Sequence, residues 1–133
     1  MNTESSRSIS AEVELSALIS LSQTADLLER ALGNVFEETD RFDEVPAFMM
    51  KQGGVEFTLF GIPEGEVCDC YVLELIAETN RGIEVLKKMG PPLIGSFLCE
   101  RLPNGRGYID FSDEFAAALQ SVGISARPLQ YNC

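Results

Sequence analysis

The chain contains no histidine, and its basic residues are half as numerous as its acidic ones. In 133 residues, 10 Lys and Arg stand against 21 Asp and Glu, for a formal net charge of −11. The absence of imidazole excludes Ser-His-Asp triads, Cys-His pairs, and zinc or haem sites with histidine ligands. The shortage of Lys and Arg argues against nonspecific nucleic-acid binding, which depends on neutralising phosphates with basic side chains. We therefore expect no nucleic-acid partner.

Long apolar runs are also missing. No stretch approaches the roughly 20 apolar residues that a membrane helix requires. Glu12 and Glu14 interrupt the first apolar segment, where a secretory signal would need an uncharged core. We expect a cytoplasmic protein with no membrane partner. Because the cytoplasm is reducing, we expect free thiols and no disulfides. The four cysteines are Cys68, Cys70, Cys99 and Cys133.

The composition is that of a folded protein. With 133 residues and 45% apolar content, the chain can bury one core but is too short for two. A charged fraction of 23% is ordinary for a globular protein. Residues 1–10 are largely polar and have Arg7 as their only base. We expect residues 1–10 to form a flexible tail and residues 11–133 to form a single α+β domain.

The first part of this domain is predicted to hold a strand and a helix. Apolar and polar residues alternate over residues 11–20, which is the period of a strand. Ser20 and Gln23 have the spacing of a capping box, and apolar residues then recur three and four apart, as in an amphipathic helix. We expect this helix to end near residues 33–38.

The middle of the chain is predicted to be β-structure. Two apolar runs, residues 45–52 and 55–61, are separated by two glycines, which favours a two-residue hairpin turn. Residues 70–78 have apolar side chains at odd and even positions. This pattern indicates either a central strand covered on both faces or the start of a helix.

The last third is predicted to contain two helices and a second hairpin. Residues 80–89 end in two lysines before a Gly-Pro-Pro stop, as helices do. Residues 93–102 and 107–111 flank an Asn-Gly turn signal, and a final helix is expected from Ser112 to Gly123. The expected order is (β)αβββαββα: an antiparallel or mixed sheet of five or six strands packed with three helices.

The acidic charge is concentrated in the first part of the chain. Residues 1–78 hold 16 acidic and four basic residues, whereas residues 79–133 hold five and six. The acidic clusters are a first group, Glu37, Glu38, Asp40, Asp43 and Glu44, and a second group, Glu64, Glu66 and Asp69. Such groups form either a solvated surface or a docking face for a basic partner, since opposed potentials raise association rates and select partners.

Phe42 lies inside the first acidic group, on an expected loop, and fits a core pattern poorly. An apolar residue ringed by carboxylates is typical of an interface anchor with a charged rim. We therefore predict a partner-binding surface made of both acidic groups and Phe42.

Other combinations of residues point less clearly to chemistry. Cys68 and Cys70, with Cys99 from a later strand, could form a thiolate metal site, but their spacing is Cys-x-Cys and no second pair exists. Buried structural cysteines are the preferred interpretation. Glu74 and Glu78 lie on one side of their element and could act as acid and base or bind a cation with Asp69, but the solvated face of a half-buried element is the preferred interpretation. No metal or cofactor is expected.

The leading functional hypothesis is a non-enzymatic, acidic, cytoplasmic binding protein that neutralises a basic protein. Bacterial immunity proteins and antitoxins have this character. Carboxylates of residues 37–44 would occlude a positively charged active site in place of substrate phosphates, with Phe42 as the apolar anchor. Either a monomer or a homodimer is compatible with this function.

Two alternatives remain open from the residues alone. The size, the acidity and the α-βββ-α-ββ-α part of the element order are similar to type III secretion chaperones. That resemblance implies a homodimer around which an extended client wraps. The other alternative is a small enzyme or ligand-binding domain that uses carboxylates, with a pocket at Glu74, Glu78 or Cys70.

Overall fold

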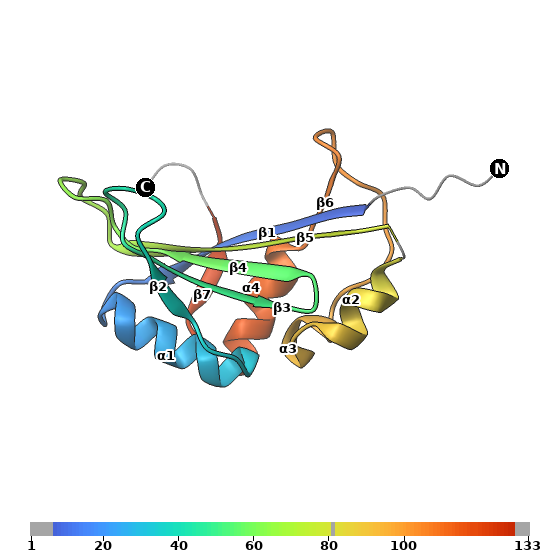
Figure 1. Ribbon diagram of the computed structural model, residues 1–133, viewed down its shortest axis with the longest axis horizontal. Coiled ribbons are helices and arrows are strands. Elements are labelled where there is room, and N and C mark those ends of the chain that lie inside the picture. Colours follow the sequence, from blue (N-terminus) through green and yellow to red (C-terminus); the bar gives the residue numbers. More distant parts are fainter. Residues whose placement is uncertain (1–6, 81, 130–133) are drawn as a thin grey trace.

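In the part of the chain that the structure describes, a mostly antiparallel sheet has seven strands, and four helices lie on one side of it (Figure 1). The structure, a computed structural model, describes residues 7–80 and 82–129. The strands are β1 (Arg7–Ser16), β2 (Glu37–Thr39), β3 (Ala47–Gln52), β4 (Val55–Phe60), β5 (Cys70–Thr79), β6 (Tyr108–Asp110) and β7 (Ala126–Pro128). The helices are α1 (Leu21–Leu32), α2 (Ile83–Met89), α3 (Pro92–Gly95) and α4 (Ser112–Ser121). The expected α+β domain is confirmed.

The strands follow the order β2-β3-β4-β5-β1-β6 across the sheet. Strands β1 and β5 pair antiparallel over ten residue pairs, from Arg7 opposite Thr79 to Ser16 opposite Cys70. The other edge of β1 is shared, because β6 pairs parallel with its first half and β7 pairs antiparallel with its second half. Strand β1 is therefore central, with neighbours on both edges.

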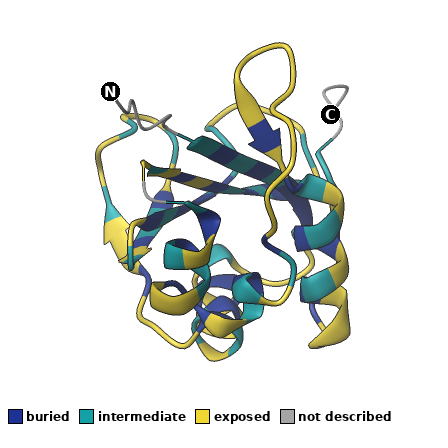
Figure 2. Cartoon of the chain, turned by 90° about the vertical axis from the view of Figure 1, so that its right-hand side faces the viewer, coloured by how far each residue is buried: buried dark blue, intermediate teal, exposed yellow. Residues whose placement is uncertain are grey.

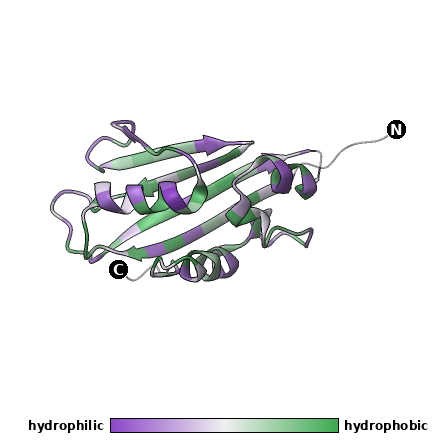
Figure 3. Ribbon diagram, turned by 90° about the horizontal axis from the view of Figure 1, so that it is seen from below, coloured by the Kyte–Doolittle hydropathy of each residue, from purple (hydrophilic) through white to green (hydrophobic). Residues whose placement is uncertain are grey.

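The sheet has one face covered by the helices and one open face, on which the described residues place no helix (Figure 1). Buried and more exposed residues alternate along the central strands (Figure 2). The covered face carries the core, where Phe57 of β4 meets Phe36 and Phe115 at ring-centroid distances of 6.4 and 6.0 Å. Hydrophilic residues lie on the outward side of α1 (Figure 3). The alternation thus divides the sheet into an apolar inner face and a polar outer face.

Several local predictions are confirmed. Helix α1 starts with the expected capping box, because Ser20 Oγ accepts from the backbone N–H of Gln23 and Gln23 Oε1 accepts from that of Ser20. Gly53 and Gly54 form the β3–β4 turn with φ of +61° and +87°. A Cβ on Gly53 would collide with the backbone carbonyl of Met89, so glycine is required there for space as well as for conformation.

The segment 93–102 is not a strand, which corrects the second predicted hairpin. Pro92 occupies the first turn of α3, where the missing N–H of proline costs nothing, and Ile94 is fully buried in that helix. The Asn-Gly turn does form, with Asn104 Oδ1 accepting from the backbone N–H groups of Arg106 and Tyr108. Only β6 follows it, and β6 pairs with β1 instead of with a preceding strand.

Other boundaries also differ from expectation. Strand β1 begins at Arg7, so residues 7–10 belong to the sheet and not to the expected tail, while residues 1–6 lie outside the described residues. Strands β2 and β7 and helix α3 were not predicted. Strand β5 is central, but helices cover only one of its faces among the described residues, and Ile76 remains on the open face. The observed order therefore departs from the order on which the resemblance to secretion chaperones depended.

An ion pair between an exposed arginine and a buried carboxylate fixes β7 to the sheet. Glu14 of β1 has a side chain only 2% exposed, and Arg127, its cross-strand neighbour, donates from Nε to Glu14 Oε1 at 2.6 Å. A carboxylate taken out of water is stable only while cationic or hydrogen-bonding partners compensate it. Arg127 is thus a structural residue of the β1–β7 pair.

We expect Arg127→Leu to lower the free energy of unfolding, because it weakens the pairing of a buried carboxylate. Urea unfolding followed by circular dichroism measures this. The double variant Glu14→Leu/Arg127→Leu, which removes the charge as well, should recover most of the loss. A single variant as stable as the wild type would contradict a structural role for this pair.

Candidate functional site

Three loops meet at the end of the sheet where β1 ends and β5 begins. We call this surface, residues 17–20, 40–46 and 61–69, the acidic end. The backbone N–H of Ala17 donates to the carbonyl of Asp69 at 3.0 Å, and that of Gly61 donates to the carbonyl of Pro46 at 2.7 Å. These bonds hold the three loops side by side at the left of Figure 1.

The acidic end brings together part of the first predicted acidic group and all of the second. Asp43 and Glu44 come from one loop, and Glu64 and Glu66 from another, about 20 residues later in the sequence. Its six exposed carboxylates are Asp40, Asp43, Glu44, Glu64, Glu66 and Asp69, and Arg41 is its one basic residue. Among the described residues no ion pair engages any of the six. The surface therefore presents an unneutralised negative potential.

Two apolar side chains on this surface are almost fully in water. Leu18 is 93% exposed, and Val67 is 100% exposed between Glu66 and Cys68. Their loops are joined by the bond between Ala17 and Asp69. Exposed apolar groups within a charged rim are typical of the centre of a protein interface.

Phe42 is less available than the sequence suggested. It is half-buried, and its ring meets that of Phe60 edge to face at 4.9 Å, with the guanidinium of Arg41 5.7 Å from the Phe42 centroid. Asp43 beside it has a φ of +57°, so this loop turns sharply back toward β3. Phe42 therefore supports the loop that carries the carboxylates. Only the remaining, exposed part of its side chain is available to a partner.

Glu37 and Glu38 lie apart from the acidic end, in the edge strand β2. Both are exposed, and both border a hollow of about 580 Å³ that Met49 and Val35 also line. Alternation along the strand directs the two side chains to opposite sides of the sheet edge. They extend the negative surface from the 40–46 loop along this edge.

A second group of carboxylates crosses the open face. Glu74 of β5 lies directly opposite Glu12 of β1, and Glu56 of β4 is its diagonal neighbour. Partial burial raises the pKa of Glu74 above its usual range, and the charges of Glu12 and Glu56 raise it further. Glu78 is on the same face, as the spacing from Glu74 predicted.

The cysteines form no such group. Cys68 and Cys70 are half-buried free thiols, and Cys99 is exposed after α3, which corrects the expectation that the cysteines are buried. For Cys99 the difference follows from the absence of the expected strand at residues 93–102. Burial, followed by the hydrogen bond to Asp69 and its charge, raises the pKa of the Cys70 thiol. In residues 7–80 and 82–129, no cluster of three or more Cys, Asp or Glu is placed to hold a metal ion; Cys133 lies outside these residues.

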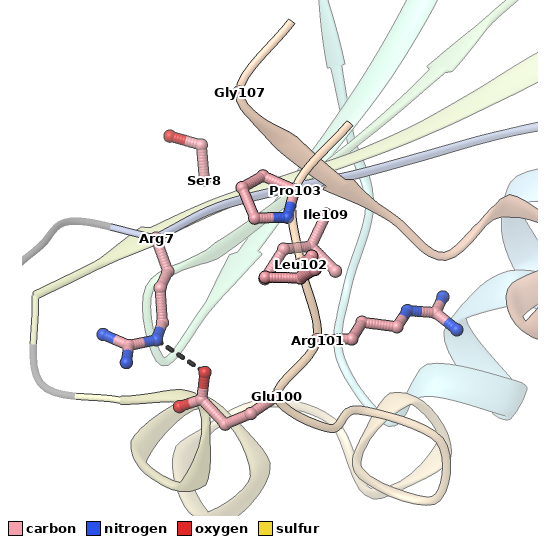
Figure 4. A pocket seen from close by; sticks show the side chains of 8 residues that line it. All are labelled: Arg7, Ser8, Glu100, Arg101, Leu102, Pro103, Gly107 and Ile109. Carbon is pink, nitrogen blue, oxygen red and sulfur yellow. Dashed lines mark hydrogen bonds and ion pairs between the residues drawn. The ribbon is translucent and has the colours of Figure 1, made fainter. Parts of the chain in front are cut away.

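A further hollow, of about 430 Å³, lies between the start of β1 and the loop before β6 (Figure 4). Arg7 Nε donates to Glu100 Oε1 at 2.6 Å, and Arg101 donates to Glu114 Oε2 at 2.8 Å. The bonds from Arg7 and from the backbone of Ile83 hold the pKa of Glu100 below its usual range. Here positive and negative charges compensate each other, unlike at the acidic end.

The sequence pattern also indicates Leu18 as a contact residue, which the prediction missed. In the alternation of residues 11–20, Leu18 falls on the polar side with Glu12, Glu14 and Ser16. An apolar residue on a solvent-facing side is a candidate contact residue. Val67 had a similar signal, because it stands alone between acidic residues in a loop containing Pro and Gly.

Comparisons with protein-family models, with curated proteins and with solved structures find no match to this chain. No helix in the described part of the chain is long and apolar enough to cross a membrane. The functional assignment therefore follows from the surfaces themselves.

We expect Glu74→Gln to raise the free energy of unfolding at pH 7, by less than about 1 kcal/mol because the group is partly solvated. The raised pKa means that the folded state disfavours the ionised form, so this penalty is present at neutral pH. It disappears as the pH falls through the raised pKa toward the ordinary value of Glu. Urea titrations at several pH values measure the difference, with Glu66→Gln as a control. A loss of stability at pH 7 would contradict the electrostatic interpretation.

Proposed function

We propose that the chain is a non-enzymatic binding protein that captures a basic protein through the acidic end. One observation carries this proposal: backbone hydrogen bonds join three loops that together carry six exposed carboxylates and the exposed side chains of Leu18 and Val67. Unneutralised surface carboxylates destabilise an isolated protein through mutual repulsion, and a basic partner removes that repulsion on binding.

The proposed mechanism has two parts. The negative potential of the acidic end, extended by Glu37 and Glu38 along β2, steers a positively charged surface toward the chain. Leu18 and Val67 then lose their contact with water, which slows dissociation. A partner whose active site is positively charged would be blocked in this way, as immunity proteins and antitoxins block their toxins.

The secretion-chaperone hypothesis receives no such support. It depended on the order of elements, and β1, β2, α3 and β7 change that order. The open face carries Glu12, Glu56, Glu74 and Glu78, so two copies packed through it would repel each other.

We expect the double variant Glu64→Lys/Glu66→Lys to lower the association rate for the basic partner at least about tenfold at low salt, with a smaller effect at high salt. The partner is first captured from lysate of the producing cells and identified. Its association with each purified variant is then followed by stopped-flow fluorescence at several ionic strengths. The matched control is Glu84→Lys/Asp113→Lys, which changes the net charge equally on α2 and α4.

The two pairs of substitutions distinguish an effect of the acidic end on the association rate from an effect of the net charge of the whole protein. The proposal requires a captured protein with a basic isoelectric point whose association slows only with the first pair. Equal slowing by both pairs, or capture of no basic protein, would overturn the acidic end as the binding surface.

We expect Leu18→Ser/Val67→Ser to raise the dissociation rate by about 10- to 100-fold and to leave the association rate nearly unchanged, because the lost contact is apolar and short-range. Both side chains are exposed, so the thermal unfolding midpoint should stay close to that of the wild type. Surface plasmon resonance with the identified partner separates the two rates. An unchanged dissociation rate would remove these residues from the interface.

A further inference from the structure

The open face has a hollow at the end opposite the acidic end. Its volume is about 370 Å³, and β1, β5, β6 and the β3–β4 turn with the start of β4 all contribute to it. The lining residues are Ser8, Gly54, Glu56, Ile76, Ala77, Glu78 and Tyr108. This hollow is separate from the surfaces used in the proposed function.

The register of the sheet explains why the hollow exists. Ser8 of β1 lies opposite both Glu78 of β5 and Tyr108 of β6. On the other side of Glu78 the chain has Gly54, which ends the hairpin turn with a φ of +87°. Across the strands, the row Tyr108, Ser8, Glu78 and Gly54 thus alternates large and small residues. Ile76, in the neighbouring row of side chains, remains 38% exposed.

The hollow combines negative charge with an aromatic and an aliphatic surface. Glu56 and Glu78 are its two charged lining residues, and Tyr108 is 41% exposed beside them. Ser8 Oγ donates to Glu78 Oε2 at 3.4 Å, and a carboxylate has further lone pairs that can accept from other donors. Lys51 is the cross-strand neighbour of Glu56, but no ion pair joins them in the described part of the chain.

We propose that this hollow binds the guanidinium group of an arginine side chain displayed by a protein partner. A guanidinium stacks on a tyrosine ring and pairs with a carboxylate through two parallel N–H donors, while its three-carbon stem packs on aliphatic groups such as Ile76. A lysine ammonium offers no planar surface for stacking on Tyr108. The inference rests on the proposed function only in taking a basic protein as the source of the arginine.

The occupant follows from charge complementarity. Beyond the hollow, the open face continues with Glu74, whose pKa is raised by partial burial and by Glu12 and Glu56. A segment that approaches this face therefore meets the carboxylates of Glu78, Glu56 and Glu74, which lie in three successive cross-strand rows. A second copy of the chain would bring like charge, whereas an arginine-bearing segment brings the opposite charge.

The test uses the whole chain labelled with ¹⁵N, three short peptides and one small molecule. The probes are the peptide acetyl-Ala-Arg-Ala-amide, its citrulline counterpart and its lysine counterpart, with arginine amide as the free small molecule. Citrulline keeps the shape of arginine and removes its charge. We expect saturable shifts at the backbone amides of Gly54, Glu56, Ile76, Glu78 and Tyr108, with the arginine peptide binding at least about tenfold more tightly than the citrulline peptide and more tightly than the lysine peptide.

Matched variants connect this binding to the hollow. Glu56→Gln/Glu78→Gln and Tyr108→Leu should each weaken binding of the arginine peptide at least about fivefold, whereas Tyr108→Phe, which keeps the ring, should bind like the wild type. Glu84→Gln/Asp113→Gln, on α2 and α4 outside both surfaces, is the charge-matched control and should change affinity less than about twofold. The same spectra report whether each variant is folded.

Several results would overturn the inference. Equal affinity for the citrulline or lysine peptide would remove guanidinium recognition, and shifts centred on the acidic end would move the site. Binding of arginine amide as tight as that of the peptide would make a small molecule the ligand instead of a protein segment. The proposed function is tested separately, since substitutions at Glu64 and Glu66 affect it while the hollow variants do not touch the acidic end.

Discussion

The ten-pair ladder between β1 and β5 is the constraint on which the rest of the structure depends. It fixes which side chains of both strands face the helices, because a shift of one residue would move every apolar side chain to the opposite face. Ile9, Val13, Leu73 and Leu75 then point into the core, while Glu12 and Glu74 point outward. The core and the acidic open face are consequences of the same register.

The same ladder separates the ends at which the surfaces form. Residues near Ser16 and Cys70 adjoin the loops of the acidic end, and residues near Ser8 and Glu78 adjoin the hollow beside Tyr108. Both regions are negatively charged, but they differ in shape. The acidic end projects loops with exposed Leu18 and Val67, whereas the hollow is recessed between rows of side chains. A single basic partner that spans the open face would contact both.

Local signals were sufficient for much of this fold. Helix α1 was predicted because Ser20, Gln23 and the apolar stripe act within a few residues of each other, and the β3–β4 hairpin was predicted because two glycines permit its turn. The α+β class followed from such elements.

Strand β2 was missed because Glu37 and Glu38 have no strand pattern, and pairing with β3 decides its conformation. Residues 93–102 were misassigned because burial of Ile94 in α3 outweighed an apolar sequence that resembles a strand. For the site, the sequence supplied the charges, but the convergence of the 40–46 and 61–69 loops depends on contacts between distant residues such as Pro46 and Gly61.

The central position of β1 also affects the order in which the fold can assemble. Its partners on one edge lie in residues 70–79, and those on the other lie in residues 108–110 and 126–128. As a ribosome synthesises the chain, β1 emerges before all of these partners and cannot pair until they follow. Contacts between such distant segments slow folding, and unpaired strand edges promote aggregation in the meantime. Glu12 and Glu14, which interrupt the apolar residues of β1, give the nascent strand the charge that opposes premature association with other chains.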